Sequence, residues 1–384
     1  SLNSWMMTVT FKKFRSLILS AAQILYAAHL GRGIAGVAFD FATTVYVVGS
    51  NESDYSIRFM RASETAQTPS DEIRTERLKR AVQAAQMGRD CYLLSRSRIY
   101  EMPNSAFLGD LSDQLIEAFK HPLGEIVPVR QGLATGDNER FMRQWFEVSV
   151  DRFYMRARDQ EDARRSGARW FPHIKGGSYR KWRGNKSVLI AFSEGDQSEL
   201  SKRGNRLPSR DFYFKPCVSW SNVSSGDVSF RFFDSSSIFG HKGSAVFSES
   251  LSGLLKYLSF LNSELVGLLA TYIAPTVMLE VGQVKNLPWI EPESFDSTGV
   301  ERLIEIFRAD WDARETSWDF ARPPYLRGGH SLLQDAFDDW YRRCCETAEE
   351  AQRLEMENNR YWANVYGLAD EAEVDVPLSR VSLT

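Results

Sequence analysis

The sequence predicts a mixed α+β protein, and three observations along the chain indicate it. The first 50 residues combine helically spaced apolar residues with short β-branched runs. Residues 124–288 alternate aromatic and β-branched residues with glycine- and serine-containing turns, as mixed α+β domains do. Residues 296–368 carry apolar side chains at helical spacing. A chain of 384 residues is long enough for two or three hydrophobic cores.

The first 50 residues predict a helix followed by two strands. Apolar residues recur every three to four positions over 10–22, which predicts a helix, and Ile24–Tyr26 and Thr44–Val48 predict buried strands. Between them, Gly31–Gly36 fits the spacing G-x-G-x-x-G. A dinucleotide site needs a helix after this motif, whereas a β-branched run follows here. The pattern therefore favours a glycine loop between two strands.

The next 70 residues predict two helices and one strand. A polar linker that includes Pro69 leads into a helix over 71–87, which Gly88 ends. Tyr92–Leu94 predicts a strand, and Leu108–Phe119 predicts an amphipathic helix.

The segment Gln131–Phe141 stands between two apolar runs, at residues 126–129 and 145–148. Its glycines tolerate positive φ, and the Asp-Asn pair after them can form hydrogen bonds with its own backbone. The segment therefore predicts a strand, a tight turn and a second strand.

Bulk composition is that of a soluble, cytoplasmic protein with no membrane partner. No window approaches the roughly 18 to 20 apolar residues that a membrane span needs. The four cysteines do not match C-x-x-C spacing and the five histidines are isolated, so no metal site is predicted. The net charge of -3 conceals a segregation, because residues 165–215 carry a net charge of +8 and residues 300–384 carry -8. Such asymmetry indicates a basic working surface beside an acidic region.

The densest basic and aromatic segment is Trp170–Asn185. Gly176 and Gly177 would let backbone approach a phosphate, and Arg180, Lys181 and Arg183 could neutralise its charge. A solvated basic hairpin whose tryptophans lie in the core would give the same pattern.

Further basic and hydroxyl residues follow in predicted loops and strand ends. Such side chains read base edges and bind phosphates, although serine-rich loops also occur without such a role. They are Lys202, Arg203, Arg206, Lys215, Ser219, Ser221 and Lys242.

Two other patterns are structural. A helix before Pro275, a turn and a short strand over Val281–Val284, closed by Leu287-Pro288, predict a packing element and a boundary near residue 290. Arg322–Tyr325 ends like an adenine methyltransferase loop, but an arginine stands where an Asn or Asp must accept from the target amine, so a turn is predicted. The common hydrolase and P-loop motifs are absent from the sequence.

Taken together, these segments resemble the adenine-specific DNA methyltransferases of the bacteriophage-exclusion (BREX) defence systems and, more distantly, restriction-modification methyltransferases. The series Phe-Pro, Lys-Gly-Gly, Arg-Lys-Trp, Gly-Asn within 171–185, at its distance from Gly136-Asp137-Asn138, carries the resemblance most specifically. It implies the end of a methyltransferase α/β sheet with a helical linker over 1–104, a target-recognition domain over 105–292 and a helical C-terminal region over 293–384.

The resemblance implies double-stranded DNA as a partner, with other defence-system proteins as further partners. It favours DNA contact by Lys175, Arg180, Lys181, Arg183, Lys202, Arg203, Arg206, Lys215, Ser219, Ser221 and Lys242. S-adenosylmethionine is the cofactor of the full-length family, in which a flipped adenine is methylated. Neither the cofactor loop nor the Asn-Pro-Pro-Tyr loop occurs in this sequence, so no cofactor-binding or catalytic residue is predicted and the chain alone is expected to be inactive. The alternative is a protein-interaction module of a defence complex, docked through the acidic helical region, without direct DNA contact.

Overall fold

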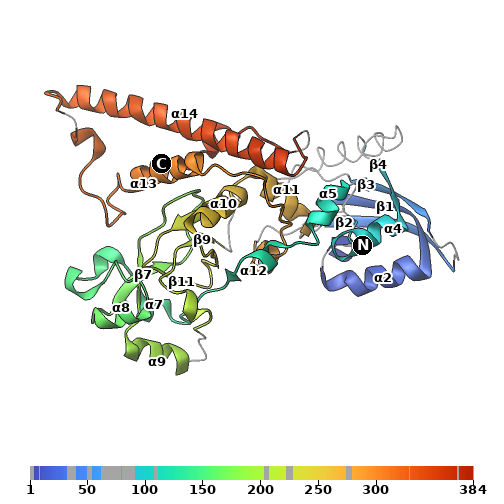
Figure 1. The fold of residues 1–384 in the computed structure, drawn as a ribbon, viewed down its shortest axis with the longest axis horizontal. Coiled ribbons are helices and arrows are strands. Elements are labelled where there is room, and N and C mark those ends of the chain that lie inside the picture. Colours follow the sequence, from blue (N-terminus) through green and yellow to red (C-terminus); the bar gives the residue numbers. More distant parts are fainter. Residues whose placement is uncertain are drawn as a thin grey trace. The chain divides into compact units, whose positions relative to one another are not determined.

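The computed structural model describes residues 4–7, 9–32, 40–49, 54–61, 79, 91–107, 111–202, 207–221, 228–273, 279–327, 329–369 and 372–383. The chain divides into two compact units, one of residues 1–122 and 269–275 and the other of residues 123–268 and 276–384. Helices and several small sheets confirm the α+β class (Figure 1). Within the described ranges, every helix is too short or too polar to cross a membrane.

The first unit is built on a four-stranded sheet of order β2-β1-β3-β4. The pairs β1–β2 and β3–β4 are antiparallel, and β1–β3 is parallel. Its strands are β1 (Ala22–Arg32), β2 (Asp40–Val48), β3 (Ser56–Arg61) and β4 (Cys91–Ser95). Its helices include α1 (Ser4–Met7), α2 (Lys12–Ala21), α4 (Arg96–Glu101) and α5 (Asp113–Ala118).

These elements confirm the helix predicted over 10–22 and the strands at 24–26, 44–48 and 92–94. In the first strand, Ile24 is buried as predicted but Tyr26 is half-exposed. The prediction that the second strand is buried was wrong, because Val45 to Val48 are each about half or more exposed. The reason is that β2 is an edge strand of its sheet. Most of the loop predicted between the strands, at 33–39, lies outside the described residues, as does the helix predicted over 71–87 apart from Lys79.

The helix predicted over Leu108–Phe119 begins later than expected. Residues 108–110 lie outside the described residues, and α5 begins at Asp113. The Ser112 side chain accepts a hydrogen bond from the Leu115 N–H and so caps the helix.

The second unit contains two four-stranded sheets of order β10-β9-β12-β5 and β11-β7-β8-β6. The first consists of β5 (Val129–Arg130), β9 (Cys217–Trp220), β10 (Phe230–Phe233) and β12 (Ala245–Val246). The second consists of β6 (Met142–Gln144), β7 (Trp170–Ile174), β8 (Val188–Ala191) and β11 (Ile238–Phe239). Helices α6 (Leu123–Ile126), α7 (Asn138–Phe141), α8 (Gln160–Arg165) and α9 (Glu194–Lys202) belong to the same half.

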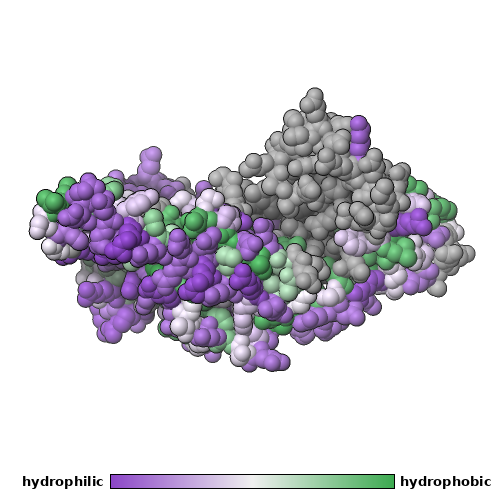
Figure 2. Space-filling model, turned by 90° about the horizontal axis from the view of Figure 1, so that it is seen from above, coloured by the Kyte–Doolittle hydropathy of each residue, from purple (hydrophilic) through white to green (hydrophobic). Residues whose placement is uncertain are grey.

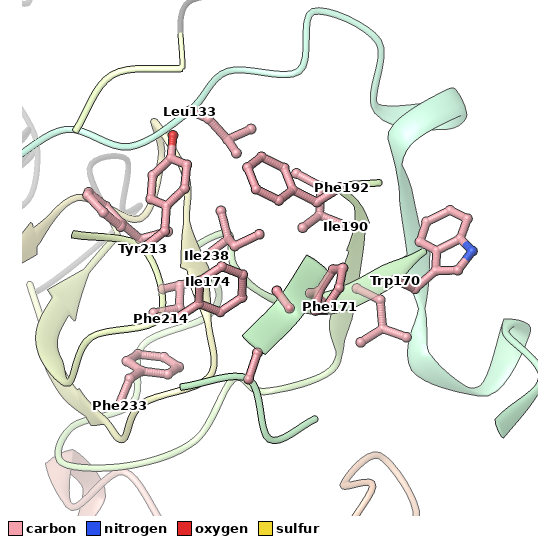
Figure 3. Packing of buried hydrophobic residues seen from close by; sticks show 14 of the residues in the cluster. Leu133, Trp170, Phe171, Ile174, Ile190, Phe192, Tyr213, Phe214, Phe233 and Ile238 are labelled. Atoms are coloured by element: carbon pink, nitrogen blue, oxygen red, sulfur yellow. The ribbon is translucent and has the colours of Figure 1, made fainter. Parts of the chain in front are cut away.

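An aromatic core supports the second of these sheets (Figure 3). Phe171 of β7 and Phe214 are buried, and their ring centroids lie 5.8 Å apart in an edge-on arrangement. Leu133, from the loop after β5, belongs to the same cluster. The core therefore fixes both the loop after β5 and the strand that leads into the Gly176-Gly177 pair.

The turn predicted within Gln131–Phe141 is present, with Gly136 at φ +65°. One helical turn, α7, follows it before β6, because the Asp137 side chain accepts from the Arg140 N–H and caps that helix. The strand expected at 145–148 was wrong, since Trp145–Glu147 form a 3-10 helix.

The remaining helices of the second unit are α10 (Leu251–Leu261), α11 (Glu264–Ile273, which continues into the first unit), α12 (Val281–Lys285), α13 (Thr298–Trp311) and α14 (Leu333–Val365). The short strand predicted at Val281–Val284 was wrong, because Glu280 and Gln283 form a capping box that starts α12. The turn predicted at Arg322–Tyr325 is confirmed, with a 3-10 turn over Pro324–Leu326.

The helical C-terminal section is confirmed, and it packs on the unit that holds both sheets. Helix α14 runs beside α13 and α10 (Figure 1). Figure 2 looks onto this side, where exposed residues are mostly hydrophilic. Trp362 of α14 is fully buried, with its ring centroid 5.2 Å from that of Phe260 in α10. Residues 293–384 therefore share a compact unit with residues 123–268. The functional boundaries at residues 104 and 292 stay predictions.

Candidate nucleic-acid interface

Three glycine-containing segments meet at one place in the second unit. They are Gln131–Gly136, Lys175–Ser178 and Gly240–Gly243, here called the glycine-loop surface. The Gly240 N–H donates to the Ile174 carbonyl at 2.9 Å, and the His241 N–H donates to the Leu133 carbonyl at 2.8 Å. The turn at 240–243 is thereby hydrogen-bonded to the segment 131–136 and to Ile174, the residue that directly precedes the segment 175–178. Motifs far apart in the sequence thus form one surface.

Close backbone approach explains why glycines stand here. A Cβ at Gly132 would lie 2.0 Å from the carbonyl oxygen of Phe239, and a Cβ at Gly243 would lie 2.5 Å from that of Ile174. Gly176 has φ +91°, a conformation that favours glycine. Substituting any of these glycines would move the loops apart or strain them.

The glycine-loop surface carries two exposed cations. Lys175 and Lys242 are both exposed, and neither forms an ion pair with another residue that the structure describes. An exposed ammonium group without an acid partner can neutralise a phosphate without first breaking a salt bridge.

A second pair of cations, Lys215 and Arg130, lies over the aromatic ring of Phe212. The Lys215 ammonium and the Arg130 guanidinium lie 5.3 and 5.4 Å from the centroid of Phe212. Both side chains are exposed, and Arg130 directly precedes the segment Gln131–Gly136. Lys215 was predicted from the sequence as a DNA contact, and Arg130 was missed.

The two predicted serines have different environments. Ser219 is fully buried, and its hydroxyl donates to the Ser244 carbonyl at 2.8 Å, which is a structural role. Ser221 is partly exposed, and its Oγ lies 2.9 Å from the Gly177 N–H and 3.0 Å from the Gly177 carbonyl. It therefore fastens the Gly176-Gly177 loop to the end of β9. The side chains of Lys202, Arg203 and Arg206 lie outside the described residues.

The other three predicted cations, Arg180, Lys181 and Arg183, are buried, with exposed fractions of 3, 4 and 8%. Each has a carboxylate partner. Arg180 pairs with Asp310 at 2.9 Å, Lys181 with Glu264 at 3.1 Å, and Arg183 with Asp234 at 2.7 Å. The prediction that they bind DNA gains no support from this geometry, because a duplex could reach them only after these pairs were broken.

This buried basic cluster, residues 180–183, connects the sheets to the C-terminal section. Arg180 donates to the Phe307 carbonyl of α13 at 2.7 Å, and the Lys181 N–H donates to the Ser382 hydroxyl at 2.8 Å. The indole N–H of Trp182 donates to a carboxylate oxygen of Glu355 in α14 at 2.7 Å. The basic and acidic parts of the sequence thus neutralise one another within the chain.

The carboxylates decide the charge state of the buried lysine. Burial alone would lower the pKa of Lys181, but Glu355, at 3.6 Å from its ammonium, and Glu264 outweigh burial and raise that pKa. For Arg180, burial dominates and lowers the pKa despite Asp310.

The sequence contained one signal that Glu355 would be buried. Glu355 shares a helical face with Asn359 and Trp362, and all three are buried.

His173 lies beneath the turn at 240–243. Its Nδ1 is 2.9 Å from the Ile238 carbonyl, which assigns the proton to Nδ1, and its buried Nε2 has no partner among the described residues. Burial lowers the pKa of His173 to about 4, so the ring is neutral at pH 7. The described residues bring together no group of three His, Cys, Asp or Glu side chains that could hold a metal ion.

In sequence, the chain is similar to proteins named as adenine-specific methyltransferases. It is 28% identical over 406 residues to "Adenine-specific methyltransferase PglX" of Lacticaseibacillus casei (strain Zhang), a match that covers 99% of this chain and 33% of the relative. It is 29% identical over 330 residues to "Adenine-specific methyltransferase BrxX" of Escherichia coli O9:H4 (strain HS), covering 84% of this chain and 26% of the relative. The resemblance to the BREX adenine-specific methyltransferases is confirmed. The chain spans a third or less of the length of these relatives.

Two solved structures are more distantly similar. The type IIL restriction-modification enzyme MmeI, solved in complex with DNA, aligns with a TM-score of 0.45 and 14% identity over 100% of this chain and 48% of that one. The type IIG restriction endonuclease BpuSI aligns with a TM-score of 0.29 and 12% identity over 92% of this chain and 46% of that one. No protein-family model matches the sequence.

Proposed function

We propose that this chain recognises the target sequence in double-stranded DNA for an adenine-specific DNA methyltransferase of a phage-defence system. The observation that carries the proposal is the glycine-loop surface. Its three segments include Gly136 and Lys175-Gly176-Gly177 from the motif series on which the resemblance to these methyltransferases rests, and it exposes Lys175 and Lys242, which form no ion pair with an acid that the structure describes.

The surface has the features that duplex binding requires. Exposed cations provide the sequence-independent attraction to phosphates, and glycines, which have no side chain, allow a phosphate to approach the backbone closely. Lys215 and Arg130, both over the Phe212 ring, extend the positive charge beside it. Compared with the sequence-based prediction, the proposal no longer assigns DNA contact to residues 180–183 and assigns it to the exposed loops instead.

We further propose that the full-length protein transfers the methyl group of S-adenosylmethionine to the N6 amine of a flipped adenine. That amine attacks the methyl carbon, the carbon–sulfur bond breaks, S-adenosylhomocysteine leaves, and the amine loses a proton. The matched relatives are named as adenine-specific methyltransferases, which supports this reaction.

The chain alone is expected to bind no S-adenosylmethionine, and isothermal titration showing micromolar affinity would contradict that expectation. Mapping methylated adenines in a genome that carries the full-length gene would identify the recognised site.

The test is the salt dependence of duplex binding, measured by fluorescence anisotropy with a labelled mixed-sequence duplex. Each lost phosphate contact lowers the slope of log K against log salt by about 0.9, so the double variant K175Q/K242Q should lower it by about 2. The charge-matched control is R308Q/R353Q, whose exposed arginines lie on α13 and α14. Equal slopes for both double variants would refute this assignment. Absence of duplex binding by the unmodified chain at low salt would favour a protein-interaction module.

A further inference from the structure

Arg231, in β10, is a fully buried cation for which no carboxylate partner exists in the part of the chain that the structure describes. Its guanidinium donates to the Arg180 carbonyl at 3.0 Å, to the Ser229 hydroxyl at 3.1 Å and to the Ser221 hydroxyl at 2.9 Å. Its Nε has no hydrogen-bond partner among the described residues. Buried charges in proteins are normally paired, because an isolated ion in a low dielectric is costly.

The neighbouring buried cations make this arrangement distinctive. Arg180, Lys181 and Arg183 each have a carboxylate partner within 3.1 Å, whereas Arg231 has neutral oxygens alone among the described residues. Burial lowers the pKa of Arg231 to about 10, which leaves the group charged at neutral pH. The fold therefore holds a positive charge whose counter-ion the described residues do not provide.

Ser221 connects the Arg231 guanidinium to the glycine-loop surface through hydrogen bonds. Its Oγ accepts from Arg231 and from the Gly177 N–H, and it donates to the Gly177 carbonyl. These three bonds saturate the hydroxyl. Ser221 is consequently a positioning residue that fixes the Gly176-Gly177 backbone above the Arg231 guanidinium.

The loop above Ser221 offers unused donors. The backbone N–H groups of Gly176 and Ser178 form no hydrogen bond with any described residue. A Cβ at Gly243 would lie 3.0 Å from the Gly176 nitrogen, so a side chain at position 243 would crowd that backbone group. Lys175 directly precedes Gly176, and Lys242 directly precedes Gly243. Both lysines are exposed.

We propose that the loop Lys175–Ser178, together with Lys242 and Gly243, is a cradle for one phosphodiester group of the DNA backbone, held in place by Ser221 and Arg231. The inference rests on the proposed DNA-binding function and adds to it a specific phosphate site. The anion accepts hydrogen bonds from the N–H groups of Gly176 and Ser178 and from the two ammonium groups, and it supplies the counter-ion that the described residues do not give Arg231.

The test uses the whole chain with three variants. Ser221→Ala removes the bridge between Arg231 and the loop, Ser221→Thr keeps a hydroxyl in its place, and Ser201→Ala removes an exposed hydroxyl that donates within its own helix. Binding of a mixed-sequence duplex is measured by anisotropy, and melting temperature is measured in inorganic phosphate and in chloride at equal ionic strength.

We expect Ser221→Ala to weaken duplex binding about tenfold, the equivalent of one hydrogen bond to a charged group, with Ser221→Thr close to the unmodified chain and Ser201→Ala unchanged. Phosphate should raise the melting temperature of the unmodified chain more than that of Ser221→Ala. A duplex affinity unchanged by Ser221→Ala would overturn the cradle while leaving the proposed function intact. If phosphate stabilises the chain through Ser221 but no duplex binds, the site takes free phosphate, and both the DNA assignment and the proposed function fail.

Discussion

The contact between Glu355 and the buried basic cluster supports a quantitative prediction about stability. Glu355 is 1% exposed, accepts from the Trp182 indole at 2.7 Å and lies 3.6 Å from the Lys181 ammonium. Glu355→Ala leaves a buried indole N–H without an acceptor, which costs about 1–3 kcal/mol. It also removes one of two carboxylates from a buried lysine, and breaking a buried pair costs about 3–5 kcal/mol in total.

Because these contributions overlap, we expect Glu355→Ala to lower the free energy of unfolding by about 3–5 kcal/mol. Glu355→Gln keeps an acceptor for the indole and should cost less than Glu355→Ala. The control is Glu357→Ala, which removes an exposed partner of Arg353 on the same helix and should cost less than about 0.5 kcal/mol. Urea denaturation followed by tryptophan fluorescence measures all three. A Glu355→Ala value within experimental error of Glu357→Ala would refute a stabilising role for this contact.

Two further predictions concern the glycine-loop surface. His173 has a pKa of about 4 in the folded chain against 6.5 for an unperturbed ring, so the unfolded chain binds the extra proton between those values and stability falls by about 3 kcal/mol as pH drops from 6.5 to 4. His173→Asn keeps a donor for the Ile238 carbonyl and should flatten that pH dependence, whereas an unchanged profile would show that other groups cause it. Gly132→Ala forces a Cβ against the Phe239 carbonyl and should destabilise the fold by about 1–3 kcal/mol or more. Gly267→Ala, in an exposed part of α11 with open space around it, should be neutral or stabilising by up to about 1 kcal/mol, and equal melting temperatures for the two alanine variants would contradict the packing argument.

Local rules predicted the elements that local interactions determine. The turn within Gln131–Phe141 follows from Gly136, which adopts positive φ, and from Asp137, which caps α7. The apolar run at Trp145–Glu147 was misassigned as a strand. Its 3-10 turn is closed by a hydrogen bond between the Glu147 carboxylate and the Gln144 N–H, which hydrophobic periodicity does not reveal.

The candidate site was predicted only in part, because its residues are selected by contacts distant in sequence. Lys175 and Lys242 were predicted from the sequence as DNA contacts and are exposed, but their position on one surface depends on the backbone bonds of Gly240 and His241. Arg231 was not among the DNA contacts predicted from the sequence. That it is buried without an acid partner could not be inferred, because burial is a property of the assembled sheet rather than of the neighbouring sequence.

The segregation of charge along the sequence led to a wrong expectation of a broad basic surface, for a physical reason that helps to locate the proposed duplex contacts. A net charge of +8 over residues 165–215 suggests a broad basic surface, but Arg180 pairs with Asp310 and Lys181 pairs with Glu355, which lie 130 and 174 positions later. In a folded chain, segments of opposite charge neutralise one another before either meets a partner. Among the described residues of that stretch, Lys175, Arg210 and Lys215 are exposed and have no carboxylate partner, and Arg210 instead donates to the side-chain amide oxygens of Gln160 and Gln197. Lys175 and Lys215 are therefore the informative cations. Lys175 lies on the glycine-loop surface itself, so the duplex-binding test is best directed there rather than at the basic run as a whole.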